Sequence, residues 1–222
     1  MSTTPPVLQQ TTPRITTRLD PAELRTQEQY KLMAGSVIPR PIALVTTLGP
    51  NGPNAAPFSF FNAIGVKPPM VMFSVGPREG AEKDTVRNLR HLPEFVVHIV
   101  DYASAEKMNI CATEFPAHIN EIERAGFHYA PSEKVAPPRL LDCPVQMECR
   151  VIEMREMGRL PYVVVFGEVL LFHFHEGIVD DRLNVDAARI DAVGRLAGTL
   201  NYTRIDNRFG MPILPVPEAD KR

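Results

Sequence analysis

The fold is decided by the stretch Arg40-Pro41-Ile42-Ala43-Leu44-Val45-Thr46-Thr47, which is followed by Gly49-Pro50-Asn51-Gly52-Pro53 and then by Asn54-Ala55-Ala56-Pro57-Phe58-Ser59-Phe60-Phe61-Asn62. The first part is apolar and β-branched, as is typical of a buried strand. The glycines and prolines after it predict a turn, and the third part resumes the β-pattern. We therefore expect a β-hairpin here.

Pro57 lies inside the second strand of this hairpin. Proline has no backbone N–H and cannot donate to a sheet ladder, so this strand is expected at an edge or interrupted at that point. Backbone groups would then be available to a ligand. An ordinary hairpin with polar turn residues explains residues 49–53 well, but explains residues 54–62 less well.

Further strands and helices are expected on both sides of the hairpin. Asp20 is a typical N-cap with Pro21 at the first helical position, which predicts a helix that stops at Gly35. Strands are predicted at 42–47, 55–59, 70–75, 94–100, 145–157 and 162–174, and helices at 84–91, 102–113 and 117–125. Residues 132–144 are expected to be irregular, and 185–200 to be partly helical. This order predicts a mainly β protein with inserted helices, an antiparallel barrel of β-barrel or α+β class, and excludes a doubly wound sheet.

The size and composition fit one domain. The chain has 222 residues, of which 44% are hydrophobic, enough to bury one substantial core. Residues 1–19 are rich in Thr and Pro without apolar periodicity, so we expect a flexible arm there and a single domain over 20–215.

Charge and cysteine content narrow the class of protein. With 24 basic and 26 acidic side chains the net charge is -2, which argues against a nucleic acid partner. Cys111, Cys143 and Cys149 show no CxxC spacing, and reduced thiols are expected. No secretory signal and no long apolar run is present, so a cytoplasmic protein with no membrane partner is predicted.

Several familiar catalytic motifs are missing from the sequence. It contains no G-x-G-x-x-G after a strand, no Walker A sequence, no G-x-S-x-G and no H-E-x-x-H. His173 and His175 would share one face of a strand, but no third ligand accompanies them, so no metal site is expected. The other histidines have no spacing that suggests a catalytic pair, and we expect structural roles for them.

Lys83-Asp84-Thr85 opens a predicted helix. A cation beside a helix start suits a phosphate group, because backbone N–H groups and the positive end of the helix dipole add to the charge. Ser59 and Thr85 could contribute hydroxyl groups. Alternatively, Asp84 caps the helix and Lys83 is a solvated surface residue.

Taken in order, these segments resemble the flavin reductase-like family of FMN-binding split barrels. The resemblance includes the strand at 40–47, the N-x-A-P-x-S-x-F segment, the KDT triplet and the later pieces Pro144-Val145-Gln146-Met147-Glu148-Cys149, Gly167-Glu168-Val169 and Val193-Gly194-Arg195-Leu196-Ala197-Gly198, with Tyr202 after them. It extends from about residue 30 to about residue 210. Ala197 replaces one of two adjacent glycines of the family pattern, so the backbone beside Arg195 has less conformational freedom than in that pattern.

The resemblance implies a set of flavin-contacting residues. Ser36 and Val37 are carried over from the segment that passes the flavin ring, and Arg40 is expected either to steer a phosphate or to pair with an acid. The candidates for the polar rim of the ring, through side chains or backbone, are Asn54, Asn62, Thr46 and Thr47. The complete cofactor-binding set is Ser36, Val37, Arg40, Thr46, Thr47, Asn54, Ala55, Ala56, Pro57, Ser59, Phe60, Asn62, Lys83, Asp84, Thr85 and Arg195.

The resemblance also implies an activity. An FMN-dependent oxidoreductase would transfer a hydride from NADH or NADPH to the flavin N5, and because the cofactor carries the chemistry, no catalytic residue is needed. A partner oxygenase or another acceptor could take the electrons, and a homodimer is implied. Two alternatives stay open: a tightly FMN-bound electron-transfer protein of flavoredoxin type, and a split barrel that only stores flavin or is purely structural.

Overall fold

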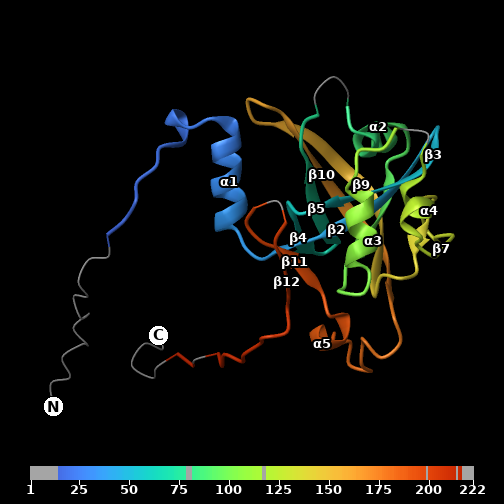
Figure 1. The fold of residues 1–222 in the computed structure, drawn as a ribbon. Helices are drawn as coiled ribbons and strands as arrows, with labels where there is room; N and C mark the ends of the chain where they lie inside the picture. The colour runs from blue at the N-terminus through green and yellow to red at the C-terminus, as the bar shows by residue number, and fades with distance from the viewer. Residues whose placement is uncertain (1–14, 79–81, 117–118, 199, 214, 217–222) are drawn as a thin grey trace, which may run out of the picture.

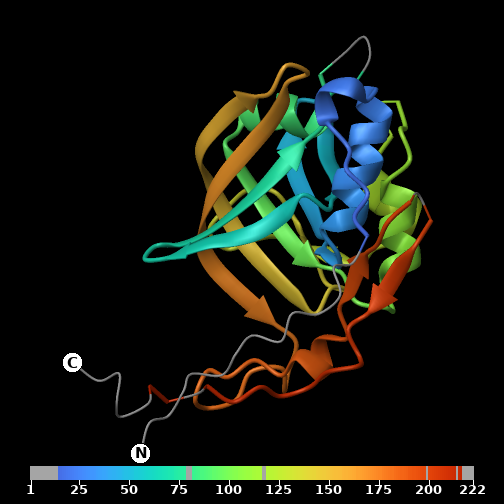
Figure 2. The ribbon, with the colours of Figure 1, turned by 90° about the vertical axis from the view of Figure 1, so that its left-hand side faces the viewer.

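A seven-stranded antiparallel sheet forms the centre of the molecule in this computed structural model, which describes residues 15–78, 82–116, 119–198, 200–213 and 215–216. The strand order is β3-β2-β6-β9-β10-β5-β4. The strands are β2 (Ala43–Gly49), β3 (Gly52–Phe58), β4 (Phe61–Val66), β5 (Pro69–Val75), β6 (Glu94–Ile99), β9 (Val145–Met157) and β10 (Tyr162–Phe174). Figure 2 shows the sheet curled into a barrel. The predicted mainly β fold with inserted helices is therefore confirmed.

The two edge strands of the barrel, β3 and β4, are neighbours in the chain. Only Ser59 and Phe60 separate them, and Ser74 of β5 donates its N–H to the carbonyl of Phe60. The barrel is thus joined at this seam by the chain itself instead of a hydrogen-bonded ladder between β3 and β4. As expected from Pro57, β3 lies at an edge.

Both faces of the sheet are buried around β2. Ala43 and Val45 point into the barrel core with Phe73 and Phe95, whose rings meet edge to face with centroids 5.5 Å apart. Leu44 points to the opposite side, into a second apolar cluster that includes Met108, Ile122 and Phe127. The alternation follows from the two-residue period of a strand, and each face needs its own cover.

Helices provide that cover (Figure 1). They are η1 (Pro21–Glu23), α1 (Thr26–Ser36), α2 (Asp84–His91), α3 (Ala105–Cys111), α4 (Glu121–Ala125) and α5 (Ala187–Ile190). Val86 and Leu89 of α2 pack into the barrel core, whereas α3 and α4 cover the outer cluster. By contrast, α1 buries only Ala34 and stands beside the barrel in Figure 1.

Short strands complete the fold. β1 (Arg40–Pro41), β11 (Val193–Arg195) and β12 (Tyr202–Arg204) form a three-stranded sheet, and β7 (Tyr129–Ala130) pairs with β8 (Arg139–Leu140). The sequence did not predict β11 or β12, because three residues carry too little periodicity. It was also wrong about the first helix, since Asp20 caps the η1 turn and α1 begins only at Thr26.

The structure describes only part of the predicted N-terminal arm. The predicted arm lies mostly outside the described residues, and its described part, 15–19, is exposed without regular structure. All three cysteines are buried and free. In the described part of the chain, no helix combines the length and apolar character needed to span a membrane.

Gly167 provides a test of the barrel packing. A Cβ there would lie 2.8 Å from Cε1 of Phe95, whose ring is fully buried and cannot move aside. We expect Gly167→Ala to lower the free energy of unfolding by about 1–3 kcal/mol through overpacking. Gly35→Ala is the matched control: its Cβ would meet only Ala197 at 3.5 Å, so stability should be unchanged or slightly raised. Equal urea midpoints for both variants would contradict this account of the core.

Candidate functional site

A small cavity lies between edge strand β3 and the first turn of α2. Its volume is about 130 Å³. The predicted site residues that line it are Asn54, Ala55, Ala56, Pro57, Lys83, Asp84 and Thr85. Two motifs that are about twenty residues apart in sequence therefore meet in one place, whereas Ser59, which was expected to join Lys83 and Thr85, does not line this cavity.

Packing of α2 places the KDT triplet. Lys83 is the extended N-cap residue of α2, and the helix is held by Val86 and Leu89, each 1% exposed. Asn88 of the same helix donates from Nδ2 to the hydroxyl oxygen of Thr47 on β2, at 3.1 Å. Thr85 donates its hydroxyl proton to Oδ1 of Asn54 at 3.3 Å. Side-chain contacts thus fix the start of α2 against the two hairpin strands.

The charges around the cavity are mixed. Arg78 lies 4.0 Å from Asp84 and 3.7 Å from Glu114, and Asp84 is also paired with Arg87. Within the described residues, Lys83 forms no ion pair, and it is half-buried at the cavity wall. Its ammonium group is therefore the positive charge most available to an anion, since the other cations near the cavity already face carboxylates.

Glu121 is a cavity residue that the sequence analysis missed. It is the first residue of α4, it is 7% exposed, and it lines the same cavity as Lys83 and Thr85. Burial raises the pKa of its carboxyl group, and the charge of Asp84 raises it further. No sequence signal distinguishes Glu121 from Glu123, which is exposed on the same helix.

Arg40 forms a second cluster at the junction of α1, β1 and the β3–β4 seam. It is 3% exposed and donates to the carbonyl oxygens of Val37 at 3.1 Å, Leu196 at 3.2 Å and Ala34. Its Nε lies 3.4 Å from the Ser59 hydroxyl oxygen, and burial lowers the pKa of the guanidinium. The guanidinium is bound to backbone carbonyls, and within the described residues it forms no ion pair with an acid.

Phe60 connects this cluster to a larger, aromatic cavity. The guanidinium carbon of Arg40 lies 6.0 Å from the centre of the Phe60 ring, and that ring lies 6.3 Å from Tyr30 and 6.1 Å from Tyr162. These three rings line a cavity of about 750 Å³ between α1 and the turn that joins β9 to β10. A volume of this size is within the range that holds small molecules.

Comparisons with known proteins agree with this architecture. The sequence model of the flavin reductase like domain matches residues 33–194. The chain belongs to the flavin reductase-like family. An uncharacterized protein of Aquifex aeolicus is 41% identical over 171 residues, which cover 76% of this chain and 86% of that protein.

Two solved structures are similar over the whole barrel. Nitrilotriacetate monooxygenase component B from Bacillus cereus superposes with a TM-score of 0.85 at 32% identity, covering 90% of this chain and all of that chain. The 2-nitrobenzoate 2-nitroreductase NbaA of Pseudomonas fluorescens gives a TM-score of 0.81 at 36% identity over 91% of this chain and all of that one. The split-barrel fold and a flavin-related oxidoreductase class follow from this membership.

Some residues named from the family pattern lie away from the cavity. Thr46 donates its hydroxyl to the carbonyl of Pro138 at 2.7 Å, and Thr47 accepts from Asn88. Asn62 is exposed on β4, where its Oδ1 accepts from the N–H of Ala63. The structure therefore does not bring these three side chains to the cavity, because strand alternation and local bonds turn them elsewhere.

The remaining candidates lie near Arg40. Ser36 and Val37 are exposed at the end of α1, and Arg195 of β11 is paired with Arg40 in the strand register. The Arg195 guanidinium lies over the ring of Tyr202, 4.6 Å from its centre, and donates to the Tyr202 hydroxyl. Tyr202 is thus a direct partner of Arg195 across the β11–β12 pair.

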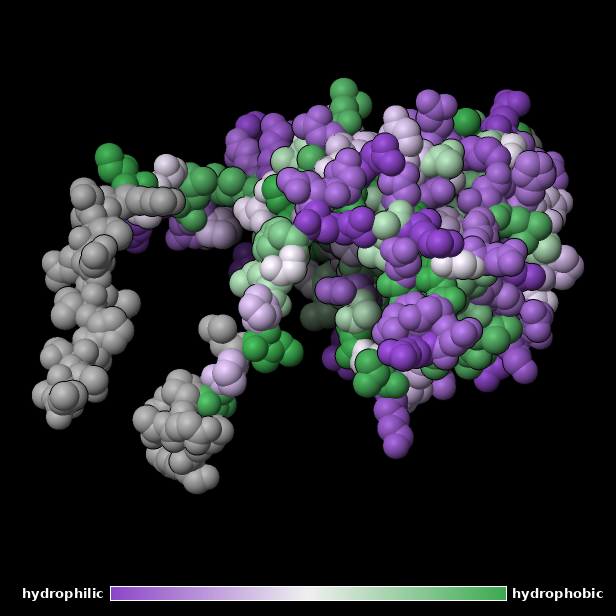
Figure 3. Space-filling view, turned by 90° about the horizontal axis from the view of Figure 1, so that it is seen from below, coloured by the Kyte–Doolittle hydropathy of each residue, from purple (hydrophilic) through white to green (hydrophobic). Residues whose placement is uncertain are grey.

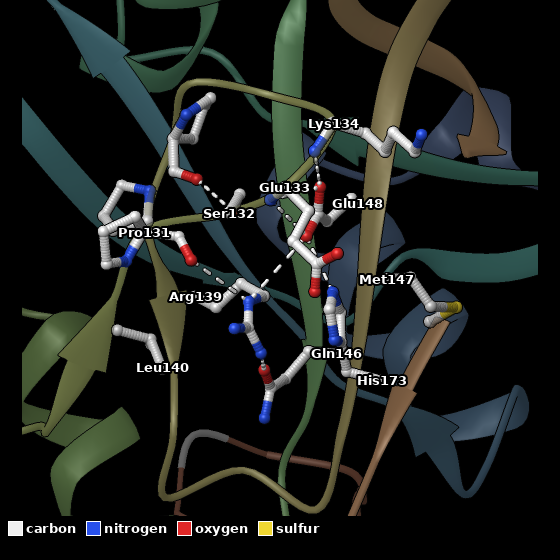
Figure 4. Close-up of polar contacts among 12 residues, drawn as sticks. Pro131, Ser132, Glu133, Lys134, Arg139, Leu140, Gln146, Met147, Glu148 and His173 are labelled. Carbon is white, nitrogen blue, oxygen red and sulfur yellow. Dashed lines mark hydrogen bonds and ion pairs between the residues drawn. The ribbon is translucent and has the colours of Figure 1, made fainter. Parts of the chain in front are cut away.

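A buried polar network on the outer face of β9 is structural (Figure 4). Glu148 accepts from the N–H groups of Glu133 and Lys134, at 2.9 and 2.6 Å, and from Nε2 of His173 at 2.7 Å. Burial would raise the pKa of Glu148, but these bonds outweigh it and lower the pKa below the usual range. The network ties the 131–140 segment to the barrel.

The histidines of this region are used in the same way. His98 is fully buried, with Nδ1 2.9 Å from the Leu44 carbonyl and Nε2 accepting from the N–H of Leu140. Burial lowers its pKa to about 3. His175 contacts the Leu141 carbonyl at 2.9 Å. Among the residues that the structure describes, no group of acidic, cysteine or histidine side chains could hold a metal ion.

Arg40 provides a test of the second cluster. We expect Arg40→Ala to lower the free energy of unfolding by about 3 kcal/mol or more, because it leaves buried carbonyl oxygens without donors. Arg204→Ala is the control, since that arginine is exposed and pairs with Asp191 at the surface, where an ion pair is worth about 1 kcal/mol or less. If denaturant unfolding shows the same small loss for both, Arg40 does not hold the junction.

Proposed function

We propose that this protein is an FMN-binding oxidoreductase that transfers a hydride from NADH or NADPH to flavin. The observation that carries the proposal is the meeting of Asn54, Lys83 and Thr85 at the open edge of a flavin reductase-like barrel. An ammonium group that forms no ion pair within the described part of the chain, together with a helix start next to an edge strand, suits a phosphate end.

The size of the cavity agrees with partial occupation by a flavin. At about 130 Å³ it is smaller than the roughly 300–1,000 Å³ of ordinary ligand pockets. It would therefore take only the phosphate and the adjoining ribityl group of the flavin. A cavity of about 220 Å³ shares Arg78 and Lys83 with it and reaches Pro161 and Val163, on either side of Tyr162. We propose that the ring system extends along this path toward the Phe60 and Tyr162 wall.

The chain's own residues would bind and orient in this reaction. Bound flavin supplies the hydride-accepting centre, so the protein needs no acid or base of its own. Lys83 would hold the phosphate, and the aromatic side chains would provide a flat apolar surface that excludes water.

The electron acceptor is proposed from the two similar structures. One is a component of a nitrilotriacetate monooxygenase, which supports transfer of electrons to a partner oxygenase. The other is a 2-nitrobenzoate 2-nitroreductase, and its 36% identity favours a nitroaromatic acid as a second candidate acceptor. A tightly bound FMN that exchanges electrons without using NAD(P)H is the remaining alternative.

A homodimer is also proposed. Tyr30, Leu32 and Met33 of α1 are exposed, and so are Phe209 and Met211 near the C-terminal end. Figure 3 shows hydrophobic residues along the extended terminal segments. Apolar surface of this extent on a single chain is typical of an interface, and a second copy would cover it.

The test of the function is a spectral titration. The purified protein, loaded with FMN, is expected to lose its yellow absorbance when NADH or NADPH is added, and to recover it when 2-nitrobenzoate or oxygen is supplied. Failure of both nucleotides to bleach the bound flavin would favour the electron carrier. A protein that binds neither FMN nor riboflavin would refute the flavin function itself.

Lys83 is tested by comparing FMN with riboflavin. We expect Lys83→Ala to weaken FMN binding by roughly ten- to hundredfold, because a charge-assisted contact to the phosphate is worth about 1.5–3 kcal/mol, and to leave riboflavin binding unchanged. The control is Lys67→Ala, which removes an exposed lysine in the β4–β5 turn. Fluorescence titrations that give equal losses for both flavins would remove Lys83 from the phosphate contact.

A further inference from the structure

The aromatic cavity of about 750 Å³ between α1 and the β9–β10 turn is distinct from the cavity that holds Lys83, because no described lining residue is common to both. Figure 1 shows the tip of the β9–β10 hairpin beside α1. The contacts proposed for the phosphate end of a flavin use none of the side chains of this aromatic cavity. These side chains can therefore recognise a second molecule.

Three aromatic rings form one continuous wall of the cavity. The Phe60 ring lies at the centre, with its centroid 6.3 Å from that of Tyr30 and 6.1 Å from that of Tyr162. Met33 and Met157 also line the cavity, and thioether sulfur makes favourable contacts with aromatic rings. A planar aromatic ligand suits such a wall, because it can stack on one ring while its edge meets another.

The turn between β9 and β10 places a positive charge at this cavity. The turn spans residues 158–161, directly after the register pair of Met157 with Tyr162. Gly158 has a φ of 90°, a conformation that favours glycine. Arg159 follows it, is exposed and lines the cavity, and it forms no hydrogen bond or ion pair with any described residue. Its guanidinium is therefore available to an anion that enters the cavity.

No carboxylate of the described lining competes for this arginine. Among the described residues that line the cavity, Arg159 carries the one charge, and the other titratable groups are the phenols of Tyr30 and Tyr162. Burial raises the pKa of Tyr162, so its hydroxyl group stays neutral and can donate a hydrogen bond. A guanidinium presents a planar pair of N–H donors that matches the two oxygens of a carboxylate. The charged group of the cavity therefore fits one carboxylate.

Tyr162 places the cavity next to the path proposed for the flavin. Gly76 lines the adjoining cavity that contains Lys83, and a Cβ at Gly76 would lie 3.1 Å from Cε1 of Tyr162. Pro161 and Val163, on either side of Tyr162, line that adjoining cavity as well. The Tyr162 ring thus stands between the two cavities, so a molecule on the aromatic wall would lie beside a flavin ring held along this path.

Charge and shape favour a small aromatic acid over a nicotinamide nucleotide in this cavity. A dinucleotide carries the charges of two phosphates, whereas the described lining offers one cation. The amide of Gln29 adds no donor, because its Nε2 already donates to the carbonyl oxygens of Pro21 and Leu24, at 2.8 and 2.9 Å. One ring and one carboxylate match an apolar wall with a single directing polar group.

We propose that the aromatic cavity, defined by Tyr30, Phe60, Arg159 and Tyr162, binds an aromatic monocarboxylate, with the ring on the aromatic wall and the carboxylate paired with Arg159. The pairing is non-covalent. The inference rests on the proposed function for the role of this acid as a reactant beside the flavin, whereas the binding site consists of the chain's own residues.

The proposal is tested by calorimetric titration of the full chain, loaded with oxidised FMN, with 2-nitrobenzoate and with its neutral amide, 2-nitrobenzamide, at about pH 7. The two probes share a ring and differ in charge. We expect Arg159→Gln to weaken 2-nitrobenzoate binding by about five- to tenfold, between the values of an exposed ion pair and of a desolvated charged hydrogen bond. Binding of 2-nitrobenzamide should be nearly unchanged.

Three further variants separate the charge from the ring. Arg159→Lys keeps the charge without the planar fork, so it should retain part of the preference for the acid. Tyr30→Leu removes a half-exposed ring and should weaken both probes alike, by about two- to tenfold. The matched control is Arg155→Gln, which changes an exposed arginine of the same hairpin that pairs with Glu153 outside the cavity, and it should bind both probes as wild type does. Thermal unfolding and sedimentation verify that each variant keeps the fold and the assembly.

Several results would contradict the proposal. Equal losses of both probes in Arg159→Gln would remove the carboxylate pairing, and a wild type that binds neither probe would remove the site. NADH affinity that falls in Arg159→Gln while 2-nitrobenzoate affinity does not would assign the arginine to a dinucleotide and overturn the inference. FMN that NADH bleaches in a protein unable to bind the acid refutes this inference alone. A protein that binds the acid through Arg159, but whose FMN neither nucleotide bleaches, supports the site and refutes the proposed hydride transfer.

Discussion

The burial of strand β2 on both faces is the constraint on which the rest of the structure depends. Its inward residues complete the barrel core, and its outward residues need the cover of α3 and α4. Because β2 is paired with both β3 and β6, no side of it is exposed. The helices that cover it carry the residues that line the cavity: α2 brings Lys83 and Thr85, and α4 brings Glu121. The site is a consequence of how this one strand is buried.

The seam between β3 and β4 leaves the barrel open, whereas β2 closes its core. A fully closed barrel leaves no unpaired backbone, whereas here the edge is left open where Pro57 removes a donor. Arg40 compensates at the other end of the seam, because its guanidinium binds the carbonyl oxygens of Val37 and Leu196 from segments far apart in the chain. An opening in the sheet is thus tolerated because a buried cation holds the segments around it.

The charges around the cavity suit discrimination between ligands more than strong attraction of any anion. Arg78 and Arg87 largely neutralise Asp84 and Glu114, so among the described residues Lys83 remains the available positive charge beside a buried acid. A ligand is therefore met by a few directed groups instead of a general positive field.

The sequence by itself determined the family, the long strands, the edge position of β3 and the meeting of the N-x-A-P segment with the KDT helix. These depend on local patterns: two-residue periodicity, a proline in a strand, and a cation before a helix. Tertiary structure alone decided that α1 begins at Thr26, that Thr46 and Thr47 turn to Pro138 and Asn88, and that Arg40 binds carbonyls. It also decided that Glu121 is buried at the cavity while Glu123 is exposed two residues away. The reason is that burial and the choice of partner depend on elements distant in sequence, which local residue patterns do not encode.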